Sequence, residues 1–469
     1  MSQHTYPVVP LDFSLRRAFL LKTFRTAGAV SLAGFLAACG GDGDDPADPT
    51  APVDPDPVDP NPPVEPEKFN PFAQFSALQP ADANGVMLPK GFSSRIVARS
   101  GQAPVSGSSF LWHAAPDGGA CYPTDGGGWI YVSNAEMTAP LGGVSALKFD
   151  KNGKIIDAYP VLKGTSGNCA GGPTPWNTWL SCEEFELTQQ IAGLVWECDP
   201  YRPWSDATPP RAWPALGKYA HEAVCVDPAN RMLYLTEDAG GGRVYRYVCD
   251  STDWPAGAER PVKFESGQLQ VLRIDALPRD ANASDAAYAD IVGFGKPPAS
   301  VTWEPVAFPD QGQKSIRDTL RAGGILPPGN YFQKAEGIWF FNGIVFFVTS
   351  SNSRIWAYDT ANRTLEVIFD GKQGTPETHS IDEPDNITIT SFGEMLVAED
   401  AGNLEIGVLR DNGTSQAVMR LVGHDDSEIT GPAVSPDGTR LYFSSQRGTT
   451  GRSEDGVTFE ILLPTKLVP

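Results

Sequence analysis

The sequence is short of the residues on which many hydrolytic and metal-binding sites depend. It has only five histidines in 469 residues, and one of them is His4 near the N-terminus. The sequence therefore offers few histidine ligands for a three-histidine zinc site. No Gly-x-Ser-x-Gly motif is present to carry the serine of a Ser-His-Asp triad. Basic residues are also scarce, 36 against 57 acids, which gives a formal net charge of −21. We therefore expect no nucleic-acid partner, whereas this charge favours the binding of cations.

Long hydrophobic runs and zinc-type cysteine spacings are missing as well. The apolar run at residues 27–38 is too short to span a bilayer comfortably, and the spacing of the cysteines fits no zinc motif. Glycine and proline are abundant, with 48 and 42 residues, beside 41% hydrophobic residues. This composition is typical of a turn-rich globular β protein with an ample core.

The N-terminal 39 residues have the pattern of an export signal. Residues 14–20 (SLRRAFL) carry twin arginines followed by an apolar pair, and residues 36–40 (LAACG) resemble a bacterial lipobox with Cys39 as the lipidated residue. The alternative is an uncleaved membrane anchor, which the short apolar run disfavours. We therefore predict a lipid-anchored protein, exported in folded form by the twin-arginine route to the bacterial periplasm or to the outer membrane and cell surface.

A linker and a single large domain follow the signal. Residues 40–69 alternate proline and aspartate, a composition that stiffens and extends the chain. Residues 70–469 then form the predicted globular domain.

This domain repeats one hairpin plan. Each copy begins in a small-residue or acidic segment, runs through two apolar strands and ends on polar or acidic residues. The copies span residues 117–136, 168–184, 221–238, 335–352, 384–400 and 430–446. The second strands begin near Trp129, Trp179, Leu233, Val345, Met395 and Leu441.

The spacing of the copies predicts an all-β fold, a six-bladed β-propeller. Most steps are about 45 to 55 residues, which suits a four-stranded blade. One step is about twice as long, so we expect a long insertion between the third and fourth blades, at residues 253–330, with a short helix at residues 316–322. In an antiparallel hairpin the first strand starts beside the end of the second. All six polar ends would therefore meet at one mouth of the central channel.

Several segments together resemble the PhoX-type alkaline phosphatases. They are NCAGGPTPWNTWLSCEE at residues 168–184, HEA at 221–223, KAEG at 334–337 and SEITGPAVSPDG at 427–438. The resemblance covers roughly residues 85–460. It implies a secreted six-bladed propeller with an iron–calcium centre, and so Ca²⁺ and Fe³⁺ as cofactors.

The resemblance also implies a set of metal ligands. They are Glu136, Cys182, Glu183, Glu222, Glu336, Asp425 and Glu428. The alternatives are a buried strand cysteine, acids that cap blades, and a solvated acidic loop. By periodicity the same mouth receives further, weaker candidates: Glu237, Asp238, Asp385, Asn386, Glu399 and Asp400. We expect most of the other cysteines to be buried structural thiols or disulfides.

Phosphate recognition is where the sequence departs from this family. Lys334 stands where the family has an arginine that grips the substrate phosphate, and a lysine lacks the bidentate fork. The family's late Gln-His-Pro-Gly reads Gln446-Arg447-Gly448-Thr449, so Arg447 is a candidate for the missing guanidinium. We also assign Asn134 to the substrate site, and Lys334 and Glu428 to catalysis.

The resulting prediction is a metal-dependent hydrolase of phosphate monoesters. Its substrate is a small-molecule phosphate ester, its membrane contact is the N-terminal lipid, and we expect a monomer. Two alternatives stay open: a calcium-dependent propeller lactonase or esterase, and a non-enzymatic surface-binding lipoprotein.

Overall fold

The computed structural model of the protein describes residues 69–375 and 378–468. The predicted signal with Cys39, and the predicted linker up to residue 68, lie outside the described residues. Within the described part, no helix is both long enough and apolar enough to cross a membrane.

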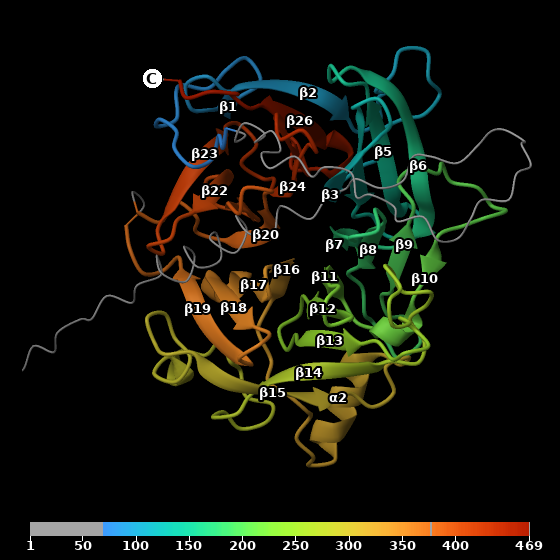
Figure 1. Cartoon of the computed structure of the whole chain (residues 1–469), viewed down its shortest axis with the longest axis vertical. Coiled ribbons are helices and arrows are strands. Elements are labelled where there is room, and N and C mark those ends of the chain that lie inside the picture. Colours follow the sequence, from blue (N-terminus) through green and yellow to red (C-terminus); the bar gives the residue numbers. More distant parts are fainter. Residues whose placement is uncertain (1–68, 376–377, 469) are drawn as a thin grey trace, which may run out of the picture.

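Antiparallel meanders of four strands surround a central axis (Figure 1). The first three contain β3 (Pro116–Pro123), β4 (Trp129–Ala135), β5 (Gly142–Phe149) and β6 (Ile155–Thr165); β7 (Asn168–Pro173), β8 (Trp179–Glu183), β9 (Val195–Cys198) and β10 (Arg211–Ala212); and β11 (His221–Asp227), β12 (Met232–Glu237), β13 (Val244–Val248) and β14 (Gln268–Ile274). The second three contain β16 (Ala335–Phe341), β17 (Ile344–Thr349), β18 (Arg354–Asp359) and β19 (Thr364–Asp370); β20 (Pro384–Ile389), β21 (Met395–Glu399), β22 (Glu405–Leu409) and β23 (Ser415–Leu421); and β24 (Ile429–Val434), β25 (Arg440–Ser445) and β26 (Val457–Leu462) with β2 (Ser93–Arg99).

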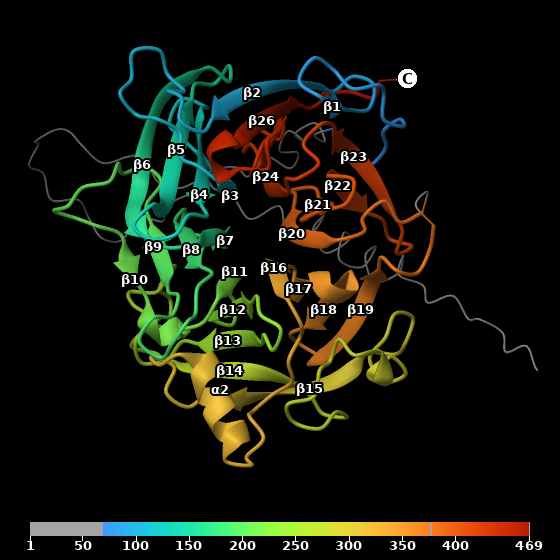
Figure 2. The ribbon, with the colours of Figure 1, turned by 180° about the vertical axis from the view of Figure 1, so that it is seen from behind.

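These meanders form a closed ring of six blades. The innermost strands β3, β7, β11, β16, β20 and β24 each contact the next, and β24 contacts β3. Hydrogen bonding groups the strands into five sheets, because β15 (Ala299–Pro305) joins the outer edges of blades three and four into one nine-stranded sheet. The view from behind shows the same ring (Figure 2). The structure thus confirms the predicted six-bladed propeller.

The N-terminal part of the domain closes the ring. Strand β2 pairs with β26 and becomes the outermost strand of the sixth blade, whose order is β2-β26-β25-β24. The two-residue strand β1 (Val86–Met87) pairs with β23 at the edge of the fifth blade. Residues from both ends of the domain therefore share one sheet, which leaves no open side to the ring.

The core lies between neighbouring blades. All six residues of β20 and all five of β21 and of β22 are buried, because blades cover both faces of each sheet. This explains why β21 (MLVAE) and β22 (EIGVL) are mainly apolar along their length instead of alternating. The rings of Phe443 and Phe459 stack within blade six, with centroids 4.9 Å apart. Each fully buried side chain of this size stabilises the fold by about 2–3 kcal/mol.

The insertion begins later and contains more structure than the sequence predicted. Residues 268–274 form β14, the fourth strand of blade three, and β15 follows before the insertion helix α2 (Gln313–Ala322). The helix starts three residues before the predicted position because the buried Gln313 side chain anchors its first turn, donating to the carbonyls of Phe308 and Gln311.

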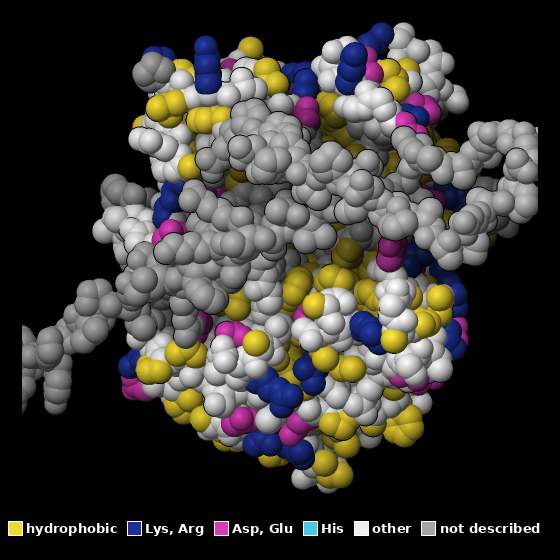
Figure 3. All heavy atoms as spheres, viewed as in Figure 1, with side chains coloured by type: hydrophobic (Ala, Val, Ile, Leu, Met, Phe, Trp, Pro, Cys, Tyr) yellow, Lys and Arg dark blue, Asp and Glu magenta, His cyan; other side chains and the backbone are white. Residues whose placement is uncertain are grey.

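On the face seen in Figure 3, basic, acidic and apolar side chains are interspersed. Its lysines and arginines are scattered over the visible described surface and do not gather into a stripe that could follow a phosphate backbone.

Candidate active site

The inner strands share an irregularity at the same end. In each, the pairing with the second strand shifts immediately after the first one or two residues, as between His221 and Val224 in β11. A bulge of this kind redirects a side chain locally. The second residues of the six inner strands, which we call the first ring, are Asp117, Cys169, Glu222, Glu336, Asp385 and Thr430.

A second ring of side chains comes from the ends of the second strands. The first residue of each inner strand pairs with the last residue of the second strand, as Pro116 does with Ala135. The residue that follows this pair therefore lies beside the first ring. These second-ring residues are Glu136, Glu184, Asp238, Ser350, Asp400 and Gln446.

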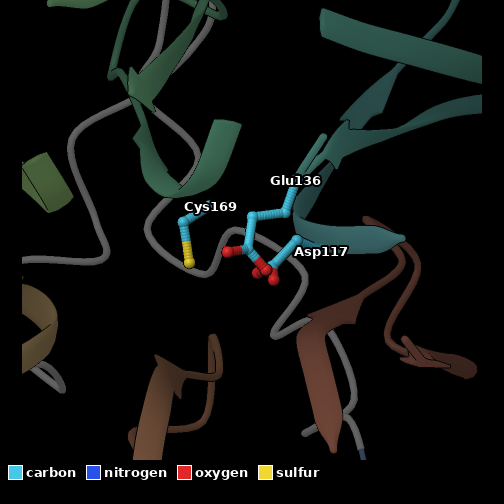
Figure 4. Close-up of side chains that lie close together, drawn as sticks. All are labelled: Asp117, Glu136 and Cys169. Carbon is cyan, nitrogen blue, oxygen red and sulfur yellow. The ribbon is translucent and has the colours of Figure 1, made fainter. Parts of the chain in front are cut away.

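Ligand atoms from the two rings come close enough to share cations. In each of three groups the carboxylate or thiol atoms all lie within 4.8 Å of one another. The groups are Asp117, Glu136 and Cys169; Cys169, Glu184 and Glu222; and Glu222, Glu336 and Asp385. Figure 4 shows the first group, with the three side chains pointing toward one another. Because Cys169 and Glu222 each belong to two groups, the groups form one continuous cluster across five blades.

Glu222 gives the clearest sign that this cluster holds cations. Its side chain is only 1% exposed, and neither carboxylate oxygen has a hydrogen-bond partner among the described residues. Burial raises the pKa of Glu222, and the nearby Asp385 and Glu184 raise it further. A buried carboxylate without partners is strongly destabilising unless a proton or a cation neutralises it. The donor set therefore fits metal ions.

The other acids of the cluster are similarly perturbed. Burial and the neighbouring Glu136 raise the pKa of Asp117 to about 7, and burial with Asp238 raises the pKa of Glu336 to about 8. Gln446 donates to both Asp117 Oδ2 and Glu136 Oε2, at 2.6 Å each, and so tethers this pair.

Two pairs of carboxyl groups share hydrogen bonds. One is Glu184 with Asp238, and the other is Glu428 with Asp400. In the second pair, burial and then the bond to Asp400 raise the pKa of Glu428, while that bond lowers the pKa of Asp400. The shared hydrogen bond therefore favours the protonated form of Glu428 over that of Asp400.

Two basic side chains stand at the edge of the cluster. Lys334 is 43% exposed, and its Nζ lies 3.6 Å from Glu336 Oε1 and 3.9 Å from Asp238 Oδ2. Burial would lower the pKa of Lys334, but the carboxylates of Asp238 and Glu336 outweigh it and raise that pKa. Arg447 lies 3.0 Å from Glu428 Oε1 through Nη2. Both positively charged side chains are close enough to the cluster to contact an anion bound there.

The structure brings some predicted ligands to the cluster and places others elsewhere. Glu136, Glu222 and Glu336 belong to it, and Glu428 adjoins it through Asp400. Cys182 does not, because its buried thiol points into an apolar cluster with Leu180 and Val195.

Glu183 and Asp425 also lie outside the cluster. The two carboxylate oxygens of Glu183 accept bonds from the backbone N–H groups of Ser166 and Leu194, so Glu183 caps strand ends, and Glu184 is the cluster acid of this hairpin. Asp425 is exposed to solvent in the loop before β24, where a carboxylate has no need of a cation.

Asn134 has a supporting position in place of the predicted substrate contact. It is fully buried, and its Nδ2 donates to the carbonyl oxygens of Cys169 and Ala170. Its Oδ1 accepts from Trp179 and from Ser181. The amide is therefore fully engaged, and it fixes the backbone that carries the Cys169 thiol.

Cys169, Asp117 and Glu184 are the cluster members that the sequence reading missed. The signal that could have found them is the alignment of the repeats. Cys169 occupies the position in its inner strand that Glu222 and Glu336 occupy in theirs. Burial, Asp117 and Glu222 raise the pKa of the Cys169 thiol, so a thiolate there needs a cation.

A closed propeller with a buried cluster of carboxylates and a thiol at one end of its inner strands defines a metal-binding propeller. The family model that matches this chain is "Alkaline phosphatase PhoX", over residues 129–448, more than half of the chain. The chain therefore belongs to the PhoX family and is an alkaline phosphatase, as the sequence predicted. No curated protein matches the chain.

Several solved structures match the chain, and one of them, with a TM-score above 0.5, shares its fold. Pseudomonas fluorescens PhoX, in complex with the transition state analogue vanadate, matches with a TM-score of 0.61 and 17% identity over 84% of this chain and 98% of that one. A Xanthomonas campestris gluconolactonase matches with a TM-score of 0.41 and 10% identity, over 83% of this chain and 99% of that one. The calcium-binding protein regucalcin of Agrobacterium tumefaciens matches with a TM-score of 0.37 and 12% identity, over 79% and 98%.

The crowded acids predict how the stability of the metal-free protein depends on pH. Because the folded-state pKa values of Asp117 and Glu336 are raised to about 7 and about 8, the native protein binds more protons than the unfolded chain above their ordinary pKa values. Stability should therefore fall as pH rises from about 5 to about 8 in a chelator. Excess Ca²⁺ should raise the melting temperature and reduce this fall. Thermal melts across this range test it, and a flat profile in the chelator would contradict it.

Proposed function

We propose that the protein hydrolyses phosphate monoesters outside the cytoplasm, with Ca²⁺ and Fe³⁺ bound in the two rings. The observation that carries the proposal is the unpartnered, buried Glu222 at the centre of the acid cluster, with Lys334 at the cluster's edge. The acids suit cations, and the ammonium suits the anionic oxygens of a phosphoryl group.

The donor types suggest which residues hold which ion. Glu222, Glu336 and Asp385 offer only carboxylate oxygens, the ligands that Ca²⁺ prefers. Cys169 adds a thiolate beside carboxylates, which suits iron. Bound metal ions would supply Lewis-acid stabilisation of charge on the phosphoryl oxygens.

The chain's own residues complete the proposed chemistry. Lys334 and Arg447 attract the dianionic substrate and neutralise charge that persists into the transition state. Burial and the hydrogen bond to Asp400 raise the pKa of Glu428, which suits its carboxyl group to protonate the leaving alkoxide as a general acid.

The proposed location follows from the N-terminal pattern of the sequence. The enzyme would leave the cytoplasm folded, by the twin-arginine route, and would stay in the periplasm or at the cell surface through a lipid on Cys39. A metal cluster could then be assembled before export. We propose that it acts as a monomer on small phosphate esters.

Substitution of Lys334 tests whether this side chain binds the phosphate group of the substrate. Lys334→Ala should lower kcat/KM for an aryl phosphate about 100-fold, through a higher KM and a lower kcat, because the charge acts on ground and transition states. Lys334→Arg should keep much of the activity, because a guanidinium can contact two phosphoryl oxygens. Steady-state kinetics of both variants provide the measurement.

The control is Lys163→Ala, which removes an exposed lysine from the outer strand β6 and should change nothing. An uncharged aryl ester serves as the second substrate. Equal, small effects of Lys334→Ala on both substrates would reject the phosphate role and favour a lactonase-like esterase.

A pair of cysteine variants tests the thiol ligand. Cys169→Ser should lose iron while the fold survives, because a neutral hydroxyl is a much weaker ligand for iron than a thiolate. Cys182→Ala should keep iron and lose only about 1 kcal/mol of stability, because this thiol packs in an apolar cluster. Elemental analysis of the purified variants decides between them. Wild-type iron in Cys169→Ser would reject Cys169 as the ligand, and loss of iron in Cys182→Ala would restore the assignment of Cys182.

A further inference from the structure

The insertion helix α2 contacts segments that carry site acids of two blades. The backbone N–H of Gln313 donates to the carbonyl of Lys218 at 2.9 Å, in the segment that leads into β11 and Glu222. The backbone N–H of Lys314 donates to Glu186 Oε1 at 3.0 Å, two residues after Glu184.

The third contact of α2 is a buried ion pair. Arg317 Nη2 lies 2.5 Å from Glu237 Oε1, and Arg317 Nη1 donates to the hydroxyl of Tyr245 at 2.7 Å. Arg317 is 5% exposed and Glu237 is 1% exposed. Glu237 Oε2 also accepts from Tyr245 and from the backbone N–H of Arg243. A buried pair with its hydrogen bonds completed in this way is strongly destabilised when one partner is removed.

Glu237 directly precedes Asp238. Its hydrogen-bond partners differ from those of the equivalent residues in two other blades. Glu183 and Glu399 also end a second strand and precede a second-ring acid. Their carboxylates accept bonds from backbone N–H groups: Glu183 from Ser166 and Leu194, and Glu399 from Asp382 and Glu405. In blade three, the equivalent Glu237 is bound by a side chain of the insertion, Arg317, in addition to a backbone N–H group.

We propose that Arg317 is a positioning residue through which α2 holds Glu184, Glu222 and Asp238 in place for cation binding. The inference rests on the proposed function, since it assigns α2 a purpose at the same site. Side chains that orient metal ligands from behind commonly change metal affinity about 10- to 100-fold when they are removed. The three contacts of α2 reach the segments that carry these acids, so loss of Arg317 should loosen two blades at once.

The test compares Arg317→Met with Lys314→Met in the full chain. Lys314 lies on the same helix, and its exposed side chain pairs with Asp318 on the surface, so its loss removes the same charge and keeps the backbone bond to Glu186. Arg317→Met should need about tenfold more Ca²⁺ or more to regain its melting temperature after chelation. Amide hydrogen exchange should accelerate at residues 184–191 and 216–222. Lys314→Met should match the wild type in both measurements.

Several outcomes would overturn the inference. Wild-type calcium demand in Arg317→Met would do so, and faster exchange without a change in calcium demand would make Arg317 merely structural. If Arg317→Met fails to fold, Arg317→Lys is measured instead. It keeps the charge but loses the planar fork that directs one donor to Glu237 and another to Tyr245, and wild-type calcium demand in that variant would reject the inference.

The wild type separates this inference from the proposed function. A wild-type protein that gains no stability from Ca²⁺ and hydrolyses no aryl phosphate would refute the proposed function itself. A calcium-stabilised, active wild type beside an unaffected Arg317→Met would refute the positioning role alone.

Discussion

Repulsion among buried carboxylates is the constraint on which this structure depends. Asp117, Glu222, Glu336 and Asp385 project from four different blades into one cluster, where burial raises the pKa of each. No single blade could hold such charges together, because each would relax away from its neighbours. A closed ring can, since contacts between successive inner strands, and of β24 with β3, fix all six strand ends. The same crowding makes the site selective for cations, whose binding removes the destabilisation.

The two acids of each pair at a blade end have different roles. In the hairpins that end on Glu183-Glu184, Glu237-Asp238 and Glu399-Asp400, the first acid is consumed by bonds that fasten strand ends. The second acid then joins the cluster or adjoins it. One position thus stabilises the scaffold and the next supplies a ligand, which explains why acids occur in pairs at blade ends.

The sequence was sufficient for the fold because a repeat of about 50 residues constrains every blade at once. It also placed Glu222 and Glu336 correctly, since each lies at a recognisable strand start. It assigned the ligand role to Cys182 and not to Cys169, which begins the hairpin that Cys182 ends. That choice depends on the bulge between Asn168 and Gly171, which determines the direction of the Cys169 side chain. Likewise, Glu183 and Glu184 differ only in which one ends the strand pairing.

The departures from the repeat place neutral and basic side chains at two positions of an otherwise acidic mouth. Second-ring positions are acidic in blades one, two, three and five, but blade four has Ser350 and blade six has Gln446. These are the two blades that supply the basic residues, Lys334 just before β16 and Arg447 just after Gln446. The neutral Ser350 and Gln446 leave Lys334 and Arg447 with fewer neighbouring carboxylates, so less of their positive charge is neutralised by the protein itself. The mouth thereby combines a cluster of acids that suits metal ions with two positions, in blades four and six, that suit an anion, which six identical blades could not provide.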